Sequence, residues 1–189
     1  MIKKGSVEIS EITDELFISS EPGTVHMEAI LERNIGLIIS MIGNHRPPQS
    51  FGHPPLKLLW LQTFDTILTP IPMRKLFLGV EKALSVIQNG NGVLCYCAQG
   101  RHRSVAMGAC ILIARGYSAV EAMERLRLQR RIARPQTWYI RKRIELFDGL
   151  WREQKEQPNR NYPPREAYSD FVTDTVSGLV WRMGFGRER

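Results

Sequence analysis

The stretch that most constrains the fold is "GVLCYCAQGRHRSVAMGACILIARG", at positions 92–116. Its first five residues form a short, mainly apolar run preceded by "NGN", which is typical of a buried strand. The run "SVAMGACILIAR" from Ser104 has the small and apolar residues of a buried helix, and Gly116 ends it. A strand, a tight glycine-containing loop and a buried helix in this order are the repeating unit of parallel α/β sheets.

The rest of the chain repeats this alternation. Short apolar runs predict further strands, and 3.6-residue periodicity predicts further helices, one opened by a capping box of Ser118 and Glu121. The predicted strands are Val7–Ile9, Leu16–Ser19, 36–40 and 56–61, and the predicted helices are 24–33, 73–88, 118–131 and 135–154. The sequence therefore predicts an α/β fold with a central, mainly parallel sheet of four to five strands, flanked by helices.

Length and composition predict one main domain. A chain of 189 residues with 43% apolar content can bury a single core. We assign residues 1–154 to this domain and the polar, proline-rich residues 155–167 to a linker. Residues 168–189 form a tail with apolar residues at helical spacing. We expect an amphipathic helix there that packs on the domain or on a second subunit, with peripheral membrane contact as the alternative.

Cysteine number and hydropathy indicate the compartment. Three cysteines cannot all form disulfides, and no apolar leader follows Met1. No apolar run approaches the roughly 18 residues that a membrane span needs. These features predict a soluble, cytoplasmic protein.

The net charge of +7 is concentrated in one segment. Residues 99–143 contain eleven basic and two acidic side chains. One interpretation is a solvated basic helix face. The other is a surface for a substrate with several phosphates, such as a phosphoinositide, an inositol polyphosphate or an RNA 5′ end. The arginines in question are Arg127, Arg130, Arg131, Arg134 and Arg141.

The loop after the strand at 92–96 has the chemistry of an anion site. Backbone N–H groups of such a loop point inward, and the following helix N-terminus adds partial positive charge. In this setting Cys97 should be a nucleophilic thiolate, since nearby positive charge lowers a thiol pKa. Arg103 can bind two oxygens of a tetrahedral oxyanion. We expect the substrate to be held by the loop residues Ala98, Gln99, Gly100, Arg101 and His102.

Cleavage of a phosphate ester also needs a proton for the departing oxygen. Asp65 is the only carboxylate between Glu32 and Glu81, and it follows a predicted buried strand. We therefore expect Asp65 to be the general acid and then the base that activates water. Ser104 can donate a hydrogen bond to the leaving thiolate. No metal and no cofactor is needed for this chemistry.

The run from Cys97 to Ser104 fits Cys-x5-Arg-Ser, and the chain resembles the dual-specificity phosphatases of the cysteine-dependent protein tyrosine phosphatase superfamily. The resemblance covers about residues 7–150 and includes the spacing of Asp65 from Cys97. It implies a phosphate-binding loop at residues 97–103 that can hold phosphate, sulfate or vanadate. It also implies hydrolysis of phosphotyrosine, phosphoserine or phosphothreonine through a phosphocysteine intermediate.

One position departs from the family pattern. The family usually places histidine before the nucleophile, where it helps keep the thiolate ionised, and this chain has Tyr96. A phenol carries no positive charge near neutral pH. One alternative is therefore a catalytically weak, phospho-binding pseudophosphatase. The basic segment motivates another alternative, a phosphatase of a polyanionic, non-protein substrate such as a phosphoinositide, which is a membrane lipid, or the 5′ phosphate of an RNA, which is a nucleic acid.

Three further expectations complete the sequence-based interpretation. Cys95 and Cys110 should be buried, small hydrophobic residues and not redox partners of Cys97. His45 and His53, in a proline-rich loop, can lie at the rim of the site or simply be exposed. Sulfur transfer of the rhodanese kind also uses a cysteine in a cationic loop, but it has no need of Asp65.

Overall fold

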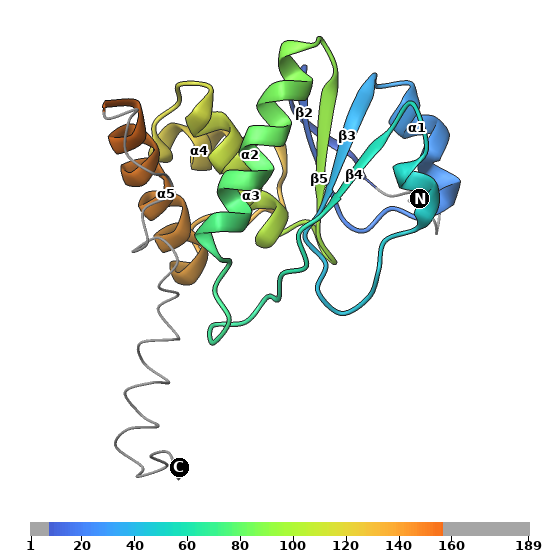
Figure 1. Cartoon of the computed structure of the whole chain (residues 1–189). Helices are drawn as coiled ribbons and strands as arrows, with labels where there is room; N and C mark the ends of the chain where they lie inside the picture. The colour runs from blue at the N-terminus through green and yellow to red at the C-terminus, as the bar shows by residue number, and fades with distance from the viewer. Residues whose placement is uncertain (1–7, 157–189) are drawn as a thin grey trace, which may run out of the picture.

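A computed structural model describes residues 8–156 and contains a five-stranded sheet in the order β1-β2-β5-β3-β4 (Figure 1). β5 pairs in parallel with both β2 and β3, and β3 pairs in parallel with β4. Only the edge strand β1 is antiparallel to its neighbour. The strands are β1 (Ser10–Thr13), β2 (Leu16–Ser19), β3 (Ile35–Ser40), β4 (Lys57–Trp60) and β5 (Gly92–Tyr96). The predicted fold class is confirmed.

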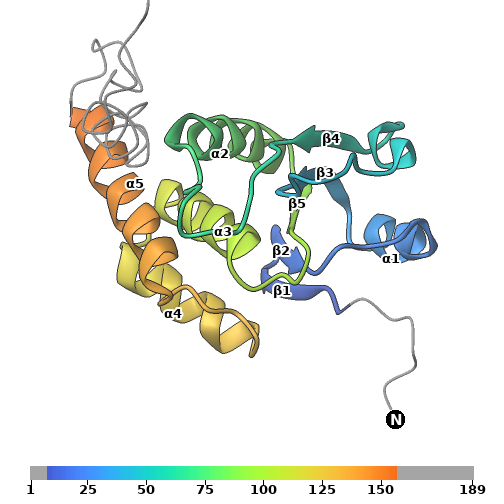
Figure 2. The same ribbon diagram turned by 90° about the horizontal axis from the view of Figure 1, so that it is seen from below.

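The helices cover the sheet unequally. In Figure 2 α2 to α5 lie on one face of the sheet and α1 lies on the other. A short 3-10 turn precedes α1, and another precedes β4. The helices are α1 (Met27–Leu31), α2 (Met73–Gln88), α3 (Arg103–Ala114), α4 (Ala119–Gln129) and α5 (Trp138–Glu156), and the 3-10 turns are η1 (Thr24–His26) and η2 (Gln49–Gly52).

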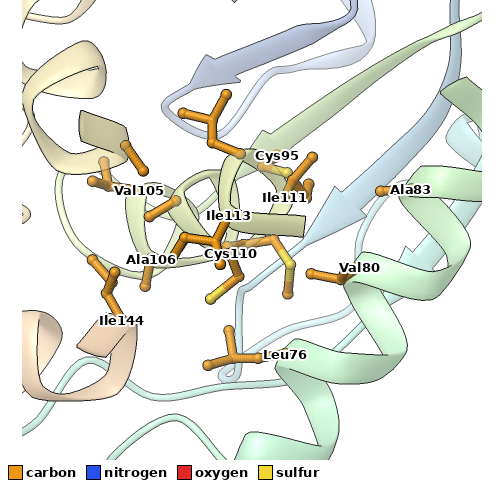
Figure 3. Packing of buried hydrophobic residues seen from close by; sticks show 14 of the residues in the cluster. Leu76, Val80, Ala83, Cys95, Val105, Ala106, Cys110, Ile111, Ile113 and Ile144 are labelled. Carbon is orange, nitrogen blue, oxygen red and sulfur yellow. The ribbon is translucent and has the colours of Figure 1, made fainter. Parts of the chain in front are cut away.

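The larger core lies between the sheet and α2 to α5, around the central helix α3 (Figure 3). Every residue of α3 from Arg103 to Ile113 is buried. Val80 and Ala83 of α2 and Ile144 of α5 pack in the same cluster. Small residues allow this close packing, since a Cβ added at Gly108 would lie 2.7 Å from a side-chain carbon of Ile18 on β2. The start of α3, which carries Arg103, is therefore part of a buried helix packed closely against the sheet.

A smaller core lies on the face covered by α1 and η2. Successive side chains of a strand point to opposite faces, so β5 contributes to both cores. Cys95 and Cys97 belong to the larger core, whereas Leu94 and Tyr96 belong to the smaller one. Tyr96 therefore points to the opposite face of the sheet from Cys97.

Three predicted boundaries were wrong. The first strand is Ser10–Thr13 and not Val7–Ile9, because pairing with β2 buries Ser10 and Ile12; Val7 itself lies outside the described residues. The helix predicted at 24–33 is divided into η1 and the short α1. The last helix begins at Trp138, because the preceding residues form an irregular segment in which the Arg134 N–H donates to the carbonyl oxygen of Arg101 at 2.9 Å.

The predicted domain ends close to the end of α5 at Glu156. Most of the predicted linker and all of the tail at 168–189 lie outside the described residues. Within residues 8–156, none of the helices combines the length and apolar character required to cross a membrane.

Candidate active site

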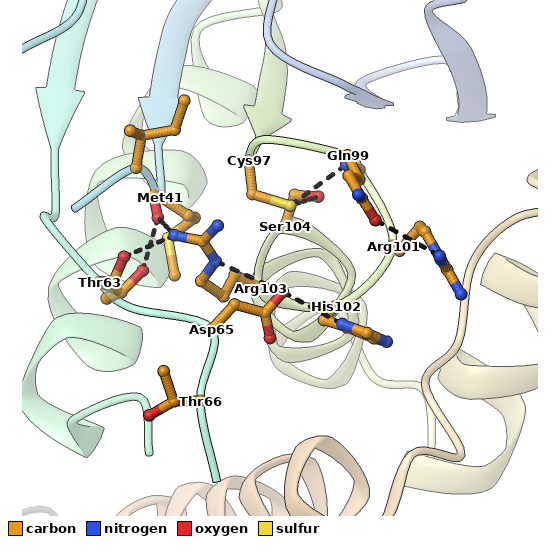
Figure 4. A network of polar contacts seen from close by, with 12 residues as sticks. Met41, Thr63, Asp65, Thr66, Cys97, Gln99, Arg101, His102, Arg103 and Ser104 are labelled. Atoms are coloured by element: carbon orange, nitrogen blue, oxygen red, sulfur yellow. Dashed lines mark hydrogen bonds and ion pairs between the residues drawn. The ribbon is translucent and has the colours of Figure 1, made fainter. Parts of the chain in front are cut away.

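The site lies where the parallel strands end. Met41 follows β3, Asp65 follows β4 in the segment 61–72, and Cys97 follows β5 (Figure 4). The carboxyl ends of parallel strands meet at one edge of a sheet, where α/β proteins place their ligands. We call residues 61–72 the Asp65 loop and residues 97–103 the Cys97 loop. The two predicted reactive residues are thus brought to the same edge.

Cys97 is buried and surrounded by hydrogen-bond donors. The backbone N–H of Gly100 donates to its Sγ at 3.2 Å, and the Ser104 hydroxyl lies 3.3 Å from it. Burial by itself would raise the pKa of the Cys97 thiol. The Ser104 hydroxyl and N–H, the charge of Arg103 and the N–H of Arg101 outweigh burial, so the pKa lies below its ordinary value. Cys97 is therefore suited to be a thiolate nucleophile.

The other two cysteines lie in an apolar environment. Cys95 and Cys110 are completely buried in the larger core, and both are free thiols. Burial, together with neighbouring thiols, raises the pKa of each well above its ordinary value. The prediction that they are buried, small hydrophobic residues is confirmed.

Arg103 is positioned by backbone carbonyl groups. Its Nη1 donates to the carbonyl oxygens of Met41 at 2.8 Å and Thr63 at 2.6 Å. Its Nε is buried and has no hydrogen-bond partner within residues 8–156. A buried donor without a partner is costly unless a ligand completes it. Nε and the adjacent Nη2 are therefore the fork that an oxyanion can use.

Gly100 gives the Cys97 loop its shape. Its φ of +65° is in the left-handed region, and a Cβ there would lie 2.6 Å from both the Ser19 carbonyl oxygen and Nη2 of Arg130. Only glycine fits this conformation and this space. The turn directs the Gly100 N–H toward Cys97 while its carbonyl oxygen faces Arg130.

Arg130 is a buried structural residue, whereas both sequence-based interpretations, a solvated basic face and a surface for a polyanionic substrate, placed it at the surface. It is 1% exposed. Its Nε donates to the Gly100 carbonyl oxygen at 2.8 Å, and its Nη1 donates to the Ser10 hydroxyl at 2.9 Å and to the Glu8 carbonyl oxygen at 3.2 Å. Arg130 thus ties the Cys97 loop to β1, and no local pattern in the sequence signals this.

Asp65 is held by two side chains from other elements. Tyr139 of α5 donates from its hydroxyl to Asp65 Oδ1 at 3.0 Å, and His102 Nδ1 lies 3.1 Å from Oδ2. Nε of Arg103 lies 3.8 Å from the same Oδ2. Sequence reasoning missed Tyr139, and it assigned His102 to substrate binding, whereas the side chain of His102 contacts Asp65.

The remaining predicted residues of the Cys97 loop face outward. Ala98 and Gln99 are exposed, and Nη1 of Arg101 lies 3.4 Å from the Gln99 side-chain oxygen.

Residues predicted at the rim and on the basic segment form ion pairs. His45 pairs with Glu21 at 2.6 Å. Among the arginines of the basic segment, Arg141 pairs with Glu145 at 2.7 Å. Within residues 8–156, no cluster of three or more His, Cys, Asp or Glu is arranged to hold a metal ion.

Tyr96 is fully buried in the smaller core, where its ring packs edge-on against Phe51. Its hydroxyl meets no partner at hydrogen-bond geometry within the described residues. Burial raises the pKa of Tyr96 to about 12, although the nearby Ser40 hydroxyl opposes this shift. The phenol is therefore neutral and gives no positive charge to the Cys97 loop.

Comparison with known proteins gives a clear result for the fold. No protein-family model matches the sequence, and no curated protein sequence matches it closely. Among solved structures, a mouse putative dual specificity phosphatase complexed with zinc tungstate has a TM-score of 0.72 at 19% identity, over 85% of this chain and 98% of that chain. Human DUSP28 has a TM-score of 0.68 at 19% identity, covering 76% and 95%.

A third similar structure is PTPMT1 in complex with PI(5)P, with a TM-score of 0.68 at 21% identity, covering 78% of this chain and 98% of that chain. The matches span nearly the whole of each known structure. The chain therefore has the fold of the dual-specificity phosphatases, as its Cys-x5-Arg-Ser signature implied.

Proposed function

We propose that the protein is a phosphomonoester hydrolase of the dual-specificity type, which acts on phosphotyrosine, phosphoserine or phosphothreonine through a phosphocysteine intermediate. One observation carries the proposal: the Cys97 thiol, with a lowered pKa, lies among N–H donors, Ser104 and Arg103. The Asp65 carboxyl stands at the rim of this anion site.

The first step transfers the phosphoryl group to sulfur. The Cys97 thiolate attacks phosphorus, the S–P bond forms and the P–O bond to the leaving group breaks. Protonated Asp65 gives its proton to the departing oxygen, which would otherwise leave as a poor alkoxide or phenoxide. Arg103 and the loop N–H groups bind the transferring oxygens, where negative charge develops.

The second step releases phosphate. Asp65, now a carboxylate, takes a proton from a water molecule whose oxygen attacks phosphorus. The P–S bond breaks, and the Ser104 hydroxyl donates a hydrogen bond to the returning thiolate. The three cysteines are free thiols, which suits a reducing compartment and supports a cytoplasmic location.

The test is hydrolysis of 4-nitrophenyl phosphate and of phosphopeptides by the full chain in the presence of a chelator. Activity should be sensitive to vanadate and absent in Cys97→Ser. Asp65→Asn should lose the alkaline limb of the pH–rate profile, because that limb reports loss of the acid's proton. Undiminished turnover by Cys97→Ser would exclude the mechanism, and thiosulfate turnover with a persulfide on Cys97 would indicate sulfur transfer.

A second candidate substrate is a lipid phosphomonoester. Large apolar side chains are exposed on the Asp65 loop: Phe64 is 51%, Ile67 57% and Leu68 74% exposed. Apolar loop tips beside a basic site can insert into an anionic membrane surface. PTPMT1, a similar structure, was solved with PI(5)P. This substrate would be favoured over a phosphoprotein if the protein hydrolysed phosphoinositide in vesicles but not phosphopeptides. The Leu68→Ser variant should then lose its activity on the vesicles.

Tyr96 motivates a third possibility, a pseudophosphatase that binds phosphorylated partners without turnover. In that case a phosphopeptide would bind in a calorimetric titration, remain intact, and lose binding in Arg103→Met. An RNA 5′-phosphate substrate would instead show turnover that falls steeply with salt, because counterion release drives binding to nucleic acid.

A further inference from the structure

We propose that His102 and Tyr139 form a clamp that positions Asp65 for proton transfer, with Tyr139 fixing Oδ1 and His102 orienting Oδ2. The inference deepens the proposed function and rests on it. The clamp joins three separate elements: the Asp65 loop, the Cys97 loop and α5.

The contacts form a closed triangle. The Tyr139 hydroxyl lies 3.0 Å from Asp65 Oδ1 and 3.3 Å from His102 Nδ1, and His102 Nδ1 lies 3.1 Å from Asp65 Oδ2. The rings of His102 and Tyr139 pack edge to face, with centroids 5.8 Å apart. The side chains of His102 and Asp65 are only 19% and 28% exposed. These contacts restrict the carboxyl group in both position and rotation.

The middle of the Asp65 loop, between Thr63 and Ile71, has little apolar packing of its own to hold the carboxyl group. Leu61 and Ile71, at the two ends of the loop, are buried, but the large apolar side chains close to Asp65 (Phe64, Ile67 and Leu68) are exposed. Its internal contacts include a turn in which the Thr69 N–H donates to the Thr66 hydroxyl at 2.9 Å. A loop with few buried apolar contacts moves readily. The clamp therefore restricts the position of the Asp65 carboxyl group, which the loop alone does not do. Proton transfer depends on such positioning.

The clamp also determines which carboxyl oxygen carries the proton. Burial and the hydrogen bond to Asp65 raise the pKa of Tyr139 to about 12, so its hydroxyl remains a donor to Oδ1 at neutral pH. The acid proton then belongs on Oδ2. Oδ2 is the oxygen near Nε of Arg103, where the phosphate is expected.

His102 acts through Asp65 and exchanges no proton with the substrate. In the tautomer that carries its proton on Nε2, His102 can accept at Nδ1 from the Oδ2 hydroxyl, and this contact orients the hydroxyl until the leaving oxygen takes the proton. After transfer Oδ2 is a carboxylate oxygen, and the proton count of His102 is unchanged. The charged or titratable groups that face the clamp are Arg101 and Arg103. His102 and Tyr139 are thus positioning residues, while Asp65 is the catalytic acid.

A leaving-group series tests the clamp. Aryl phosphates are compared in wild type, Tyr139→Phe and His102→Leu. For 4-nitrophenyl phosphate, whose leaving group needs little protonation, kcat/KM should change by less than about threefold. For phenyl phosphate it should fall at least about tenfold, since a general acid contributes about 10²–10⁴-fold.

Two variants separate positioning from general damage. His102→Asn places an amide group near the position of Nδ1. Its side-chain oxygen can accept from the Oδ2 hydroxyl as Nδ1 does, so this variant should recover most of the loss seen in His102→Leu. In an Asp65→Asn background, Tyr139→Phe should have no further effect, because the residue it positions is gone. The matched control is Tyr117→Phe, which removes a hydroxyl at the turn between α3 and α4, outside the site.

A second measurement does not depend on activity. The ¹⁵N NMR shift of His102 Nδ1 should move in Asp65→Asn and in Tyr139→Phe but not in Tyr117→Phe. Three results would overturn the clamp. The first is a ¹⁵N shift of His102 Nδ1 that does not move, and the second is an equal fall in kcat/KM for all leaving groups. The third is that Tyr139→Phe lowers kcat/KM as much in the Asp65→Asn background as in wild type. Absence of any phosphatase activity in wild type, with the shift moving as expected, would overturn the proposed function and leave the geometry of the clamp established.

Discussion

Nε of Arg130 donates to the carbonyl oxygen of Gly100 at 2.8 Å, and this bond connects the end of α4 to the middle of the Cys97 loop. The same guanidinium reaches the Ser10 hydroxyl on β1. A buried, charged side chain thus holds the turn that directs the Gly100 N–H toward Cys97.

Arg130→Met should destabilise the fold and weaken oxyanion binding together. It leaves buried acceptors without donors, each of which costs about 1–3 kcal/mol, so we expect the free energy of unfolding to fall by about 3 kcal/mol or more. Urea denaturation and vanadate inhibition measure the two effects. The control is Arg131→Met, an exposed neighbour that should change stability by less than about 0.5 kcal/mol. Equal behaviour of the two variants would contradict the role of Arg130.

Gly100→Ala should abolish vanadate binding, whereas Gly90→Ala should not. Both glycines have positive φ, +65° and +76°, so both variants incur a backbone cost of about 1–2 kcal/mol. A Cβ at Gly90 meets nothing within 4 Å, but one at Gly100 collides with Ser19 and Arg130. The pair therefore isolates the effect of crowding in the Cys97 loop. Normal vanadate inhibition of folded Gly100→Ala would contradict the prediction.

The regular elements around the site were predictable because their signals are local. α2 and β5 have the bounds expected from helical periodicity and from the glycines that punctuate the chain. Cys97, Arg103 and Ser104 were likewise identifiable, since one short motif places them between β5 and α3.

The supporting residues were not predictable, because their roles depend on partners distant in sequence. Arg130 contacts residues 30 and 120 positions away, and Tyr139 contacts Asp65 across 74 positions. On local pattern Arg130 is one of several arginines on a basic helix, and Tyr139 is one aromatic residue among others near the start of α5. Their function arises only when the loops converge at one edge of the sheet.

Ser104→Ala should shift the pH dependence of Cys97 alkylation to higher pH. The Ser104 hydroxyl helps lower the pKa of the Cys97 thiol, so its removal should raise that pKa. Iodoacetamide labelling from pH 5 to 9 measures the midpoint. Cys95 and Cys110 should not interfere, because burial raises the pKa of both. An unchanged midpoint would exclude a role for Ser104 in thiolate stabilisation.

Tyr96→His should raise phosphatase activity although it weakens packing. Histidine is smaller than tyrosine and leaves space beside Phe51, so we expect a loss of about 1–3 kcal/mol in stability. Its positive charge, when protonated, should lower the pKa of Cys97 further and shift the acid limb of kcat/KM toward lower pH. Steady-state kinetics from pH 5 to 8 measure both the limb and the rate.

Tyr96→Phe separates charge from packing at the same position. The Tyr96 hydroxyl is buried without a partner at hydrogen-bond geometry, so its removal should be neutral or stabilising by up to about 1 kcal/mol and should leave kcat/KM unchanged. If Tyr96→Phe and Tyr96→His raised activity equally, removal of the buried Tyr96 hydroxyl would be the cause. A gain confined to His would show that the residue before the nucleophile limits the ionisation of Cys97.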